Sequence, residues 1–221
     1  MVRRALVIVL FTALVLGGAA HGPVRDAHAA ARLGTTDQLT ILPDLRTVRF
    51  GKAVTVRGLL TRGGAPVGGA PVLVHRLGTT TGTAVVTDAQ GRYTAAVRPR
   101  SNARWVASFG DLESKATLIR VAPRVTLSLS HRKKAKRLVE YFRGSVAPRH
   151  AGSSMKVQRW TRSGWRAVAS GRLDARSRYT IAWVLPRGSA TYRLRVILPA
   201  HEDHARGSSL PVTLQVVAGR G

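Results

Sequence analysis

The strongest constraint on the fold of this chain is an internal repeat with an offset of 86 residues. A glycine, an aspartate and a tyrosine recur at this offset: Gly58 and Gly144, Asp88 and Asp174, and Tyr93 and Tyr179. Three anchors that share one offset indicate a duplication. The period matches a β-sandwich domain, whereas a solenoid repeat would run about 20–50 residues. The sequence therefore predicts two copies of one domain.

The hydrophobic pattern predicts that both copies are all-β. Residues 192–196 alternate apolar side chains with arginines, which is the period of two of a half-buried strand. Turn clusters at residues 62–66 and 186–188 separate such stretches. We expect about seven short strands per copy, as in an immunoglobulin-type sandwich. Because Pro123 ends the last strand of the first copy, the predicted domains are residues 38–122 and 123–218, after a linker at 30–37.

Glu140 conflicts with this pattern. It stands where the first copy has Val54, on the inward side by the parity of Val56 and Phe142. We therefore expect either a bulge in the second copy or an open sheet edge that carries Glu140.

Residues 1–29 have the three parts of a secretion signal. Arg3 and Arg4 precede an uncharged stretch at 5–16, and small residues follow at 17–20. The stretch is shorter than the about 20 residues that span a bilayer, which favours a cleaved signal over a retained anchor, the alternative. Cleavage fits after Ala20 or after Ala29. We expect a secreted protein, extracellular or at the cell surface, without a transmembrane segment after cleavage.

The strand and turn residues resemble tandem bacterial Ig-like domains, and also the carboxypeptidase-regulatory-like and transthyretin-like sandwiches. The resemblance rests on Val54, Val56, Gly58, Asp88, Gly91, Arg92 and Tyr93 in the first copy, and on Phe142, Gly144, Trp165, Ser177, Arg178 and Tyr179 in the second. Such modules recur in secreted proteins of high-GC Gram-positive bacteria. The resemblance implies two tandem Ig-like β-sandwich domains, and it transfers no catalytic residue because the modules share none. Ser177 departs from the turn glycine of the family, which puts the strand register in question.

The composition excludes several kinds of site. The chain has no cysteine, so it has no disulfide, thiolate metal site or thiol nucleophile. The closest carboxylates, Asp111 with Glu113 and Glu202 with Asp203, are not held across a cleft as acid–base hydrolysis requires. No serine stands in a G-x-S-x-G turn, and no phosphate-binding loop occurs. We predict a non-enzymatic structural, adhesive or binding module at the cell surface, with no catalytic residues, no cofactor and no metal.

The alternative function is a small metal-assisted hydrolase that uses His201, Glu202 and His204. The two histidines are three residues apart, not four as in the helical H-E-x-x-H motif. They lie between a predicted strand and the turn at 207–209, which favours a solvated loop.

The densest positive charge lies at residues 131–137. Its cations are Arg132, Lys133, Lys134, Lys136 and Arg137. GC-rich codons account for the abundant arginine of a chain with a formal charge of +26, but not for the clustered lysines. Such a cluster attracts polyanions, so contact with an anionic cell-wall polymer or polysaccharide is one interpretation; a solvated loop is the other, and charge runs of this kind favour it. Sequence-specific nucleic-acid binding is not expected, because most aromatic residues are predicted to point inward and cannot stack on bases.

Trp160 and Trp165 stand on either side of a predicted hairpin turn. If both indoles are exposed, they form a platform for sugar stacking beside flanking arginines. If they are packed, they close one end of the sandwich core and pair across the hairpin. A further candidate partner is another surface protein, docked by strand addition to an open sheet edge.

Overall fold

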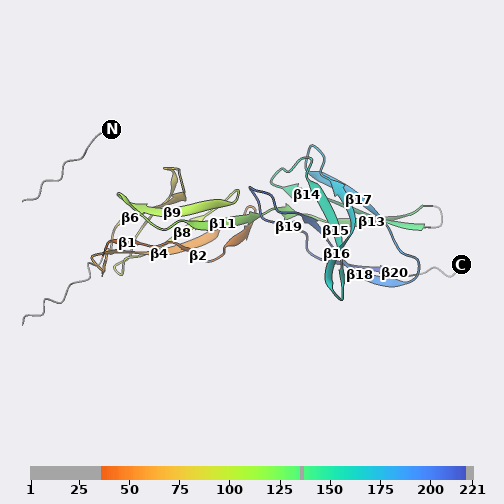
Figure 1. The fold of residues 1–221 in the computed structure, drawn as a ribbon, viewed down its shortest axis with the longest axis horizontal. Helices are drawn as coiled ribbons and strands as arrows, with labels where there is room; N and C mark the ends of the chain where they lie inside the picture. Colours follow the sequence, from red (N-terminus) through yellow and green to blue (C-terminus); the bar gives the residue numbers. More distant parts are fainter. Residues whose placement is uncertain (1–35, 135–136, 218–221) are drawn as a thin grey trace, which may run out of the picture. The chain divides into compact units, whose positions relative to one another are not determined.

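The computed structural model describes residues 36–134 and 137–217, and every helix-or-strand element of this part of the chain is a strand. Buried apolar residues form two separate cores, one drawn from residues 39–121 and the other from residues 125–198. Figure 1 shows the strands that enclose each core. The predicted class, all-β with two tandem Ig-like sandwiches, is confirmed, whereas the predicted signal at residues 1–29 lies outside the described residues.

The first sandwich consists of a five-stranded and a six-stranded sheet. In the five-stranded sheet, β4 (Val54–Arg62) pairs with β1 (Gln38–Leu39), β2 (Leu42–Pro43), β5 (Ala65–Pro66) and β8 (Arg92–Val97). The other sheet has the order β3 (Thr47–Arg49), β11 (Thr117–Ala122), β9 (Ala103–Phe109), β6 (Pro71–Arg76), β7 (Gly82–Val86), with β10 (Leu112–Glu113) paired to β9. Alternation buries Val54 and Val56 of one sheet in the same core as Val72 and Val74 of the other.

The second sandwich has β14 (Arg137–Ala147) between β13 (Ser128–Lys134) and β17 (Arg178–Val184). A second group of strands has the order β16 (Gly164–Arg172), β15 (Ser154–Thr161), β18 (Ala190–Leu198), β20 (Val212–Val216). The short β12 (Arg124–Val125) and β19 (Gly207–Ser208) connect β14 to β18. Phe142 and Ile181 from the first group share one core with Met155, Val157 and Leu194 from the second.

The strand count agrees with the expected seven per sandwich once the shortest pairings are set aside. Within the described residues, β1 to β11 form the first sandwich and β12 to β20 the second. Four strands of the first (β1, β2, β5 and β10) and two of the second (β12 and β19) are two residues long, which leaves seven longer strands in each. The alternating pattern therefore detects the strands that build the core, and it misses two-residue bridges because these are too short to alternate.

The repeat seen in the sequence is a repeat of one cross-strand pair. Gly58 on β4 is the partner of Tyr93 on β8, and Gly144 on β14 is the partner of Tyr179 on β17. In both sandwiches the tyrosine hydroxyl donates a hydrogen bond of 2.5 Å to a backbone carbonyl 53 residues earlier in the chain. Burial raises the pKa of both hydroxyls, so they remain protonated donors. The repeated residues therefore anchor the first strand of each sandwich to its core.

The turn before each tyrosine is also repeated. Oδ1 of Asp88 and of Asp174 accepts hydrogen bonds of 2.8–3.0 Å from the backbone N–H groups two and four residues further on. The hydrogen bond from the N–H of Arg178 is the largest cause of the lowered pKa of Asp174. Ser177 has a φ of 58°, close to the 71° of Gly91 in the first sandwich. Ser177 thus adopts the left-handed conformation itself, and the register of the second sandwich is unchanged.

Both expectations for Glu140 are wrong. β14 pairs without a register shift with β13 on one side and β17 on the other, so Glu140 lies neither at a bulge nor on an edge. Its side chain points inward, is 1% exposed, and has no hydrogen-bond partner on either carboxylate oxygen. Desolvation raises the pKa of this carboxyl, and the charge of His131, its cross-strand partner, only partly opposes the rise.

Replacing this carboxyl should stabilise the protein. We expect Glu140→Leu to raise the free energy of unfolding at neutral pH by about 1–3 kcal/mol, because leucine has no polar atom to desolvate. The pKa of Glu140 is higher in the folded protein than in the unfolded chain. At acid pH the carboxyl is protonated in both states and its charge has no effect on stability. As the pH rises through the folded-state pKa, the folded protein loses stability relative to the unfolded chain. Urea unfolding followed by circular dichroism from about pH 4 to about pH 8 measures both effects.

The matched control for this substitution is Glu113→Leu, which removes an exposed carboxylate on β10. It should change the free energy of unfolding by no more than about 0.5 kcal/mol. The stability gain of Glu140→Leu over the unaltered chain should grow with pH. A variant that is less stable than the unaltered chain at neutral pH, or whose gain does not change with pH, would contradict the assignment.

Candidate functional site

The cations predicted to contact a polyanion lie on a projecting hairpin. β13 and β14 remain paired out to Lys134 and Arg137, whereas β17 accompanies β14 only from Ser145 to Val139. The strands therefore continue past the sheet as a two-stranded ribbon, which Figure 1 shows at the end of β13. We call the exposed set Arg132, Lys133, Lys134 and Arg137 the basic hairpin. Lys136, the fifth predicted member, lies outside the described residues.

The positive charge of the basic hairpin is not neutralised by neighbouring carboxylates. Across residues 36–134 and 137–217, lysine and arginine side chains form two salt bridges, Arg62 with Asp37 and Arg178 with Asp174. Neither salt bridge lies on the basic hairpin. Lys134 and Arg137 are also direct cross-strand partners, and like charges in such positions repel. An anion placed between them would relieve this repulsion.

The two tryptophans pair with each other across the β15–β16 hairpin. Trp160 and Trp165 are cross-strand partners, with ring centroids 5.3 Å apart and planes at 69°, an edge-to-face arrangement. Trp160 is 50% exposed, and neither ring belongs to the core cluster of the sandwich. The tryptophans therefore pair across the hairpin, as the packed alternative predicted, but they do not close the end of the sandwich core.

Arginines from β18 cover Trp165. The guanidinium carbon of Arg195 lies 4.1 Å from the centroid of the Trp165 ring, and that of Arg193 lies 6.0 Å from it. Arg195 Nε also donates a hydrogen bond of 2.9 Å to Gln158 Oε1. Desolvation and then the charge of Arg206 lower the pKa of Arg195. The ring of Trp165 is thus covered by Arg193 and Arg195, and Trp160 is the tryptophan of this pair that offers an exposed ring to a ligand.

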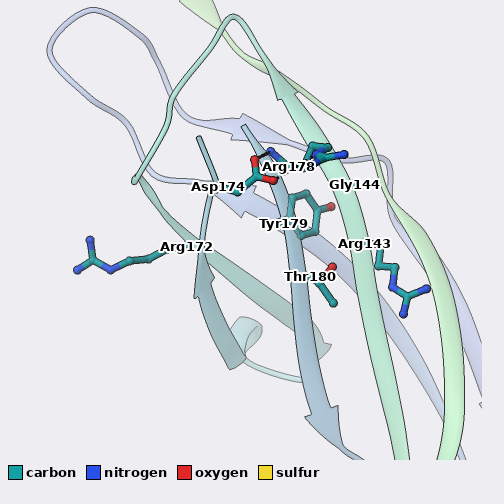
Figure 2. Close-up of a pocket in the computed structure, with 7 residues that line it drawn as sticks. All are labelled: Arg143, Gly144, Arg172, Asp174, Arg178, Tyr179 and Thr180. Carbon is teal, nitrogen blue, oxygen red and sulfur yellow. Dashed lines mark hydrogen bonds and ion pairs between the residues drawn. The ribbon is translucent and has the colours of Figure 1, made fainter. Parts of the chain in front are cut away.

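A hollow of about 530 Å³ lies over the Gly144–Tyr179 pair (Figure 2). Its polar lining includes Arg143, Arg172, Arg178 and Asp174. Oδ2 of Asp174 already accepts a 3.2 Å hydrogen bond from Nε of Arg178, and Figure 2 shows Arg143 and Arg172 directed to opposite sides. A matching hollow of about 390 Å³ lies over the Gly58–Tyr93 pair of the first sandwich. Each hollow thus lies beside one of the repeated glycines, and the arginines beside the Gly144–Tyr179 pair do not converge on one ligand position.

The ligand atoms of His201, Glu202 and His204, the three residues of the alternative metal site, do not converge, although the backbone N–H of His201 donates a 2.9 Å hydrogen bond to the carbonyl of His204. His201 and Glu202 are exposed, whereas His204 is 4% exposed. The potential ligand atoms that do converge belong to His150, Asp203 and His204, and all lie within 4.8 Å of one another. Sequence reasoning missed His150, because it lies in the loop after β14, far from residues 201–204 in the chain, and it chose Glu202 rather than its neighbour Asp203 as the carboxylate. No local spacing could have revealed this set.

Comparisons with known proteins identify no family. No family model matches the chain, and no curated protein matches it in sequence. Among solved structures, the D0-D1 domain of intimin is 9% identical, with a TM-score of 0.32, over 80% of this chain and 97% of that one. The adhesin InvE of Yersinia pseudotuberculosis is 14% identical, with a TM-score of 0.41, over 82% of this chain and 61% of that one. A segment of two fibronectin type III domains from chicken tenascin is 14% identical, with a TM-score of 0.40, over 82% and 99%. At these identities and scores none of them transfers a ligand or an activity to this chain.

The described residues contain no helix that is long and apolar enough to cross a membrane.

Proposed function

We propose that this chain is a secreted, non-enzymatic binding module that holds an anionic polymer of a cell surface through its basic hairpin. The observation that carries the proposal is the two-stranded ribbon with four exposed cations and no salt bridge to a carboxylate of the described residues. Successive side chains of a strand point to opposite faces, so the ribbon presents cations on both faces. A polymer with regularly spaced phosphates or carboxylates can contact several of these cations at once.

The arrangement of aromatic residues supports a polymer backbone as the ligand rather than a base sequence. Tyr93, Tyr179 and Trp105 are buried, and Trp183 packs edge to face on Tyr192 at 5.2 Å. These rings are therefore not free to stack on bases. Electrostatic contact with phosphate or carboxylate groups requires no such stacking, because it depends on charge density alone. The proposed partners are accordingly anionic wall polymers and acidic polysaccharides.

Co-sedimentation with purified Gram-positive cell wall tests the proposal. The chain should pellet with intact wall at low ionic strength, and much less with wall stripped of its anionic polymers. Binding should fall steeply as salt rises, because salt screens the cations and removes the gain from counterion release. Absence of pelleting, equal binding to stripped wall, or binding that does not respond to salt would each refute the proposal.

A Trp160→Ala variant separates charge from sugar stacking in the same assay. If the basic hairpin holds the polymer, this variant should bind as the unaltered chain does at every salt concentration. If stacking on the exposed indole holds a sugar, binding should persist at high salt and be lost in Trp160→Ala, and the proposal would then be wrong.

A further inference from the structure

Two histidines of the second sandwich each have one ring nitrogen that is bound to a backbone carbonyl and a second ring nitrogen that is buried. His150 Nδ1 lies 2.7 Å from the carbonyl oxygen of Pro148. A carbonyl only accepts, so Nδ1 carries the proton, and in the neutral ring Nε2 holds a lone pair. This Nε2 is buried and has no partner. Buried polar atoms are nearly always paired, so an orphaned imidazole nitrogen calls for a missing partner.

His204 shows the same arrangement with its two nitrogens exchanged. Its Nε2 donates a hydrogen bond of 2.9 Å to the carbonyl oxygen of Arg100. Its buried Nδ1 faces Oδ2 of Asp203 at 2.9 Å, a distance at which a proton joins the two atoms, and a metal ion bound here would take the place of that proton. The ring of His204 packs against that of His150 with centroids 4.8 Å apart. Two buried ring nitrogens and a carboxylate oxygen are thus gathered in one place.

We propose that His150, Asp203 and His204 bind one divalent transition-metal ion of the zinc class. Two imidazole nitrogens and a carboxylate oxygen are a donor set that Zn²⁺ accepts. Histidines that bind metal commonly donate their other ring N–H to a carbonyl or carboxylate, as both rings do here. None of the three residues belongs to the basic hairpin, and the inference does not depend on polymer binding.

The distances require only a small closure of the site. A tetrahedral ion with bonds of about 2.0–2.1 Å holds its ligand atoms about 3.4 Å apart, and the three potential ligand atoms lie within 4.8 Å of one another. The side chain of Asp203 is 64% exposed, so it is free to turn toward the ion and leaves a path from solvent. The fourth position is open to water.

Hydrogen bonds hold the backbone on both sides of the site. The Oγ of Ser177 accepts a 2.7 Å hydrogen bond from the N–H of His150. The backbone N–H of Asn102 donates to the carbonyl of Asp203 at 2.7 Å, and its Nδ2 donates to the carbonyl of Glu202 at 3.2 Å. The ligands are therefore positioned before an ion arrives, which lowers the entropic cost of binding.

The site is not part of the duplicated framework. At the 86-residue offset the first copy has Gly64 in place of His150. The first copy also has Gly91 where Ser177 fixes His150. The second sandwich thus carries a histidine cluster, and the serine that orients it, which the shared fold does not require.

Titration of Zn²⁺ into the full chain, purified without a histidine tag and treated with chelator, tests the inference by calorimetry. We expect saturable binding of one ion per chain, and no competition from excess Mg²⁺, which prefers oxygen ligands. Zn²⁺ at about a hundredfold above its Kd should raise the Tm by about 5 °C or more. Co²⁺ in the same site should give the visible absorption of a tetrahedral ligand field, a readout that requires no variant.

A histidine and a carboxylate that are not proposed ligands, His201 and Glu202, give the matched controls. His150→Gln and Asp203→Asn should each weaken Zn²⁺ binding more than about tenfold, whereas His201→Gln and Glu202→Gln should bind as the unaltered chain does. Circular dichroism of each metal-free variant establishes that it is folded. Absence of saturable binding would overturn the inference, and so would loss of binding in the His201 and Glu202 variants alone, or equal weakening in all four.

Discussion

A variant in which all four residues of the basic hairpin are replaced by glutamine should lose affinity for anionic polymer by on the order of a hundredfold or more. A cation beside an anionic surface contributes about 1 kcal/mol at physiological salt, and each 1.4 kcal/mol is a tenfold change in affinity. Within the described residues, no carboxylate forms a salt bridge with the basic hairpin. Its four cations are therefore available to the polymer. The measurement is the cell-wall co-sedimentation assay at low ionic strength.

The matched control removes the same charge from another place. Arg49, Arg57, Arg92 and Arg120 are exposed residues of the first sandwich, and their replacement by glutamine lowers the net charge equally. If the ligand recognises the local field of the hairpin, this control should keep most of the affinity. Equal loss in the two variants would show that net charge attracts the polymer, and the basic hairpin would then not be its binding site.

The basic-hairpin variant should remain folded, so loss of binding can be read as loss of contact. Its four side chains are exposed and lie at or beyond the end of the pairing with β17. Exposed substitutions typically change the free energy of unfolding by no more than about 0.5 kcal/mol. Removal of the repulsion between Lys134 and Arg137 works in the stabilising direction.

Gly144→Ala should destabilise the second sandwich by about 3 kcal/mol, the largest effect that we expect from adding a single methyl group. A Cβ at this position would collide with the backbone carbonyl of Thr126 and the hydroxyl oxygen of Tyr179. These two atoms form the hydrogen bond that anchors the first strand of the sandwich. The collision cannot be relieved by rotating a flexible side chain, because one partner is backbone and the other is a buried ring. Urea unfolding followed by tryptophan fluorescence measures the loss, because the tryptophans Trp160, Trp165 and Trp183 belong to this sandwich.

Two controls separate collision from other causes. Gly152→Ala places a methyl group at a glycine with a φ of 76° and no atom within 4 Å, so it should cost only about 1 kcal/mol of backbone strain. Tyr179→Phe removes the hydrogen bond without a collision and should cost about 1–2 kcal/mol. If Gly144→Ala costs no more than Gly152→Ala, the close approach of the strands is not what selects glycine at this position.

Much of the framework could be predicted from the chain because its signals are local. Gly58 and Gly144, and the tyrosines opposite them, recur because each sandwich needs the same close approach and the same buried hydrogen bond. The alternation of apolar and charged residues marked the long strands for the same reason, since neighbouring side chains report which face is buried. The limits of the domains and the secretion signal remain predictions.

Glu140 shows where local reasoning fails. Its inward parity was correct, but the cost of an unpaired buried carboxylate suggested that the strand must bulge or lie at an edge. The structure keeps the strand central and leaves the carboxyl unpaired, because seven residues of regular pairing with each neighbour outweigh one unfavourable side chain. Whether the strand stays central therefore depends on its pairing with β13 and β17, which the identity of residue 140 does not reveal.

The amino-acid sequence alone determined that the chain is a duplicated all-β protein with a cation-rich hairpin, because period, turn chemistry and charge density are properties of neighbouring residues. Only the tertiary structure decided which histidines meet, that Trp165 is covered by arginines, and that Glu140 is buried without a partner. These features depend on loops and strands far apart in the chain, and the packing of the whole sandwich sets the distances between them.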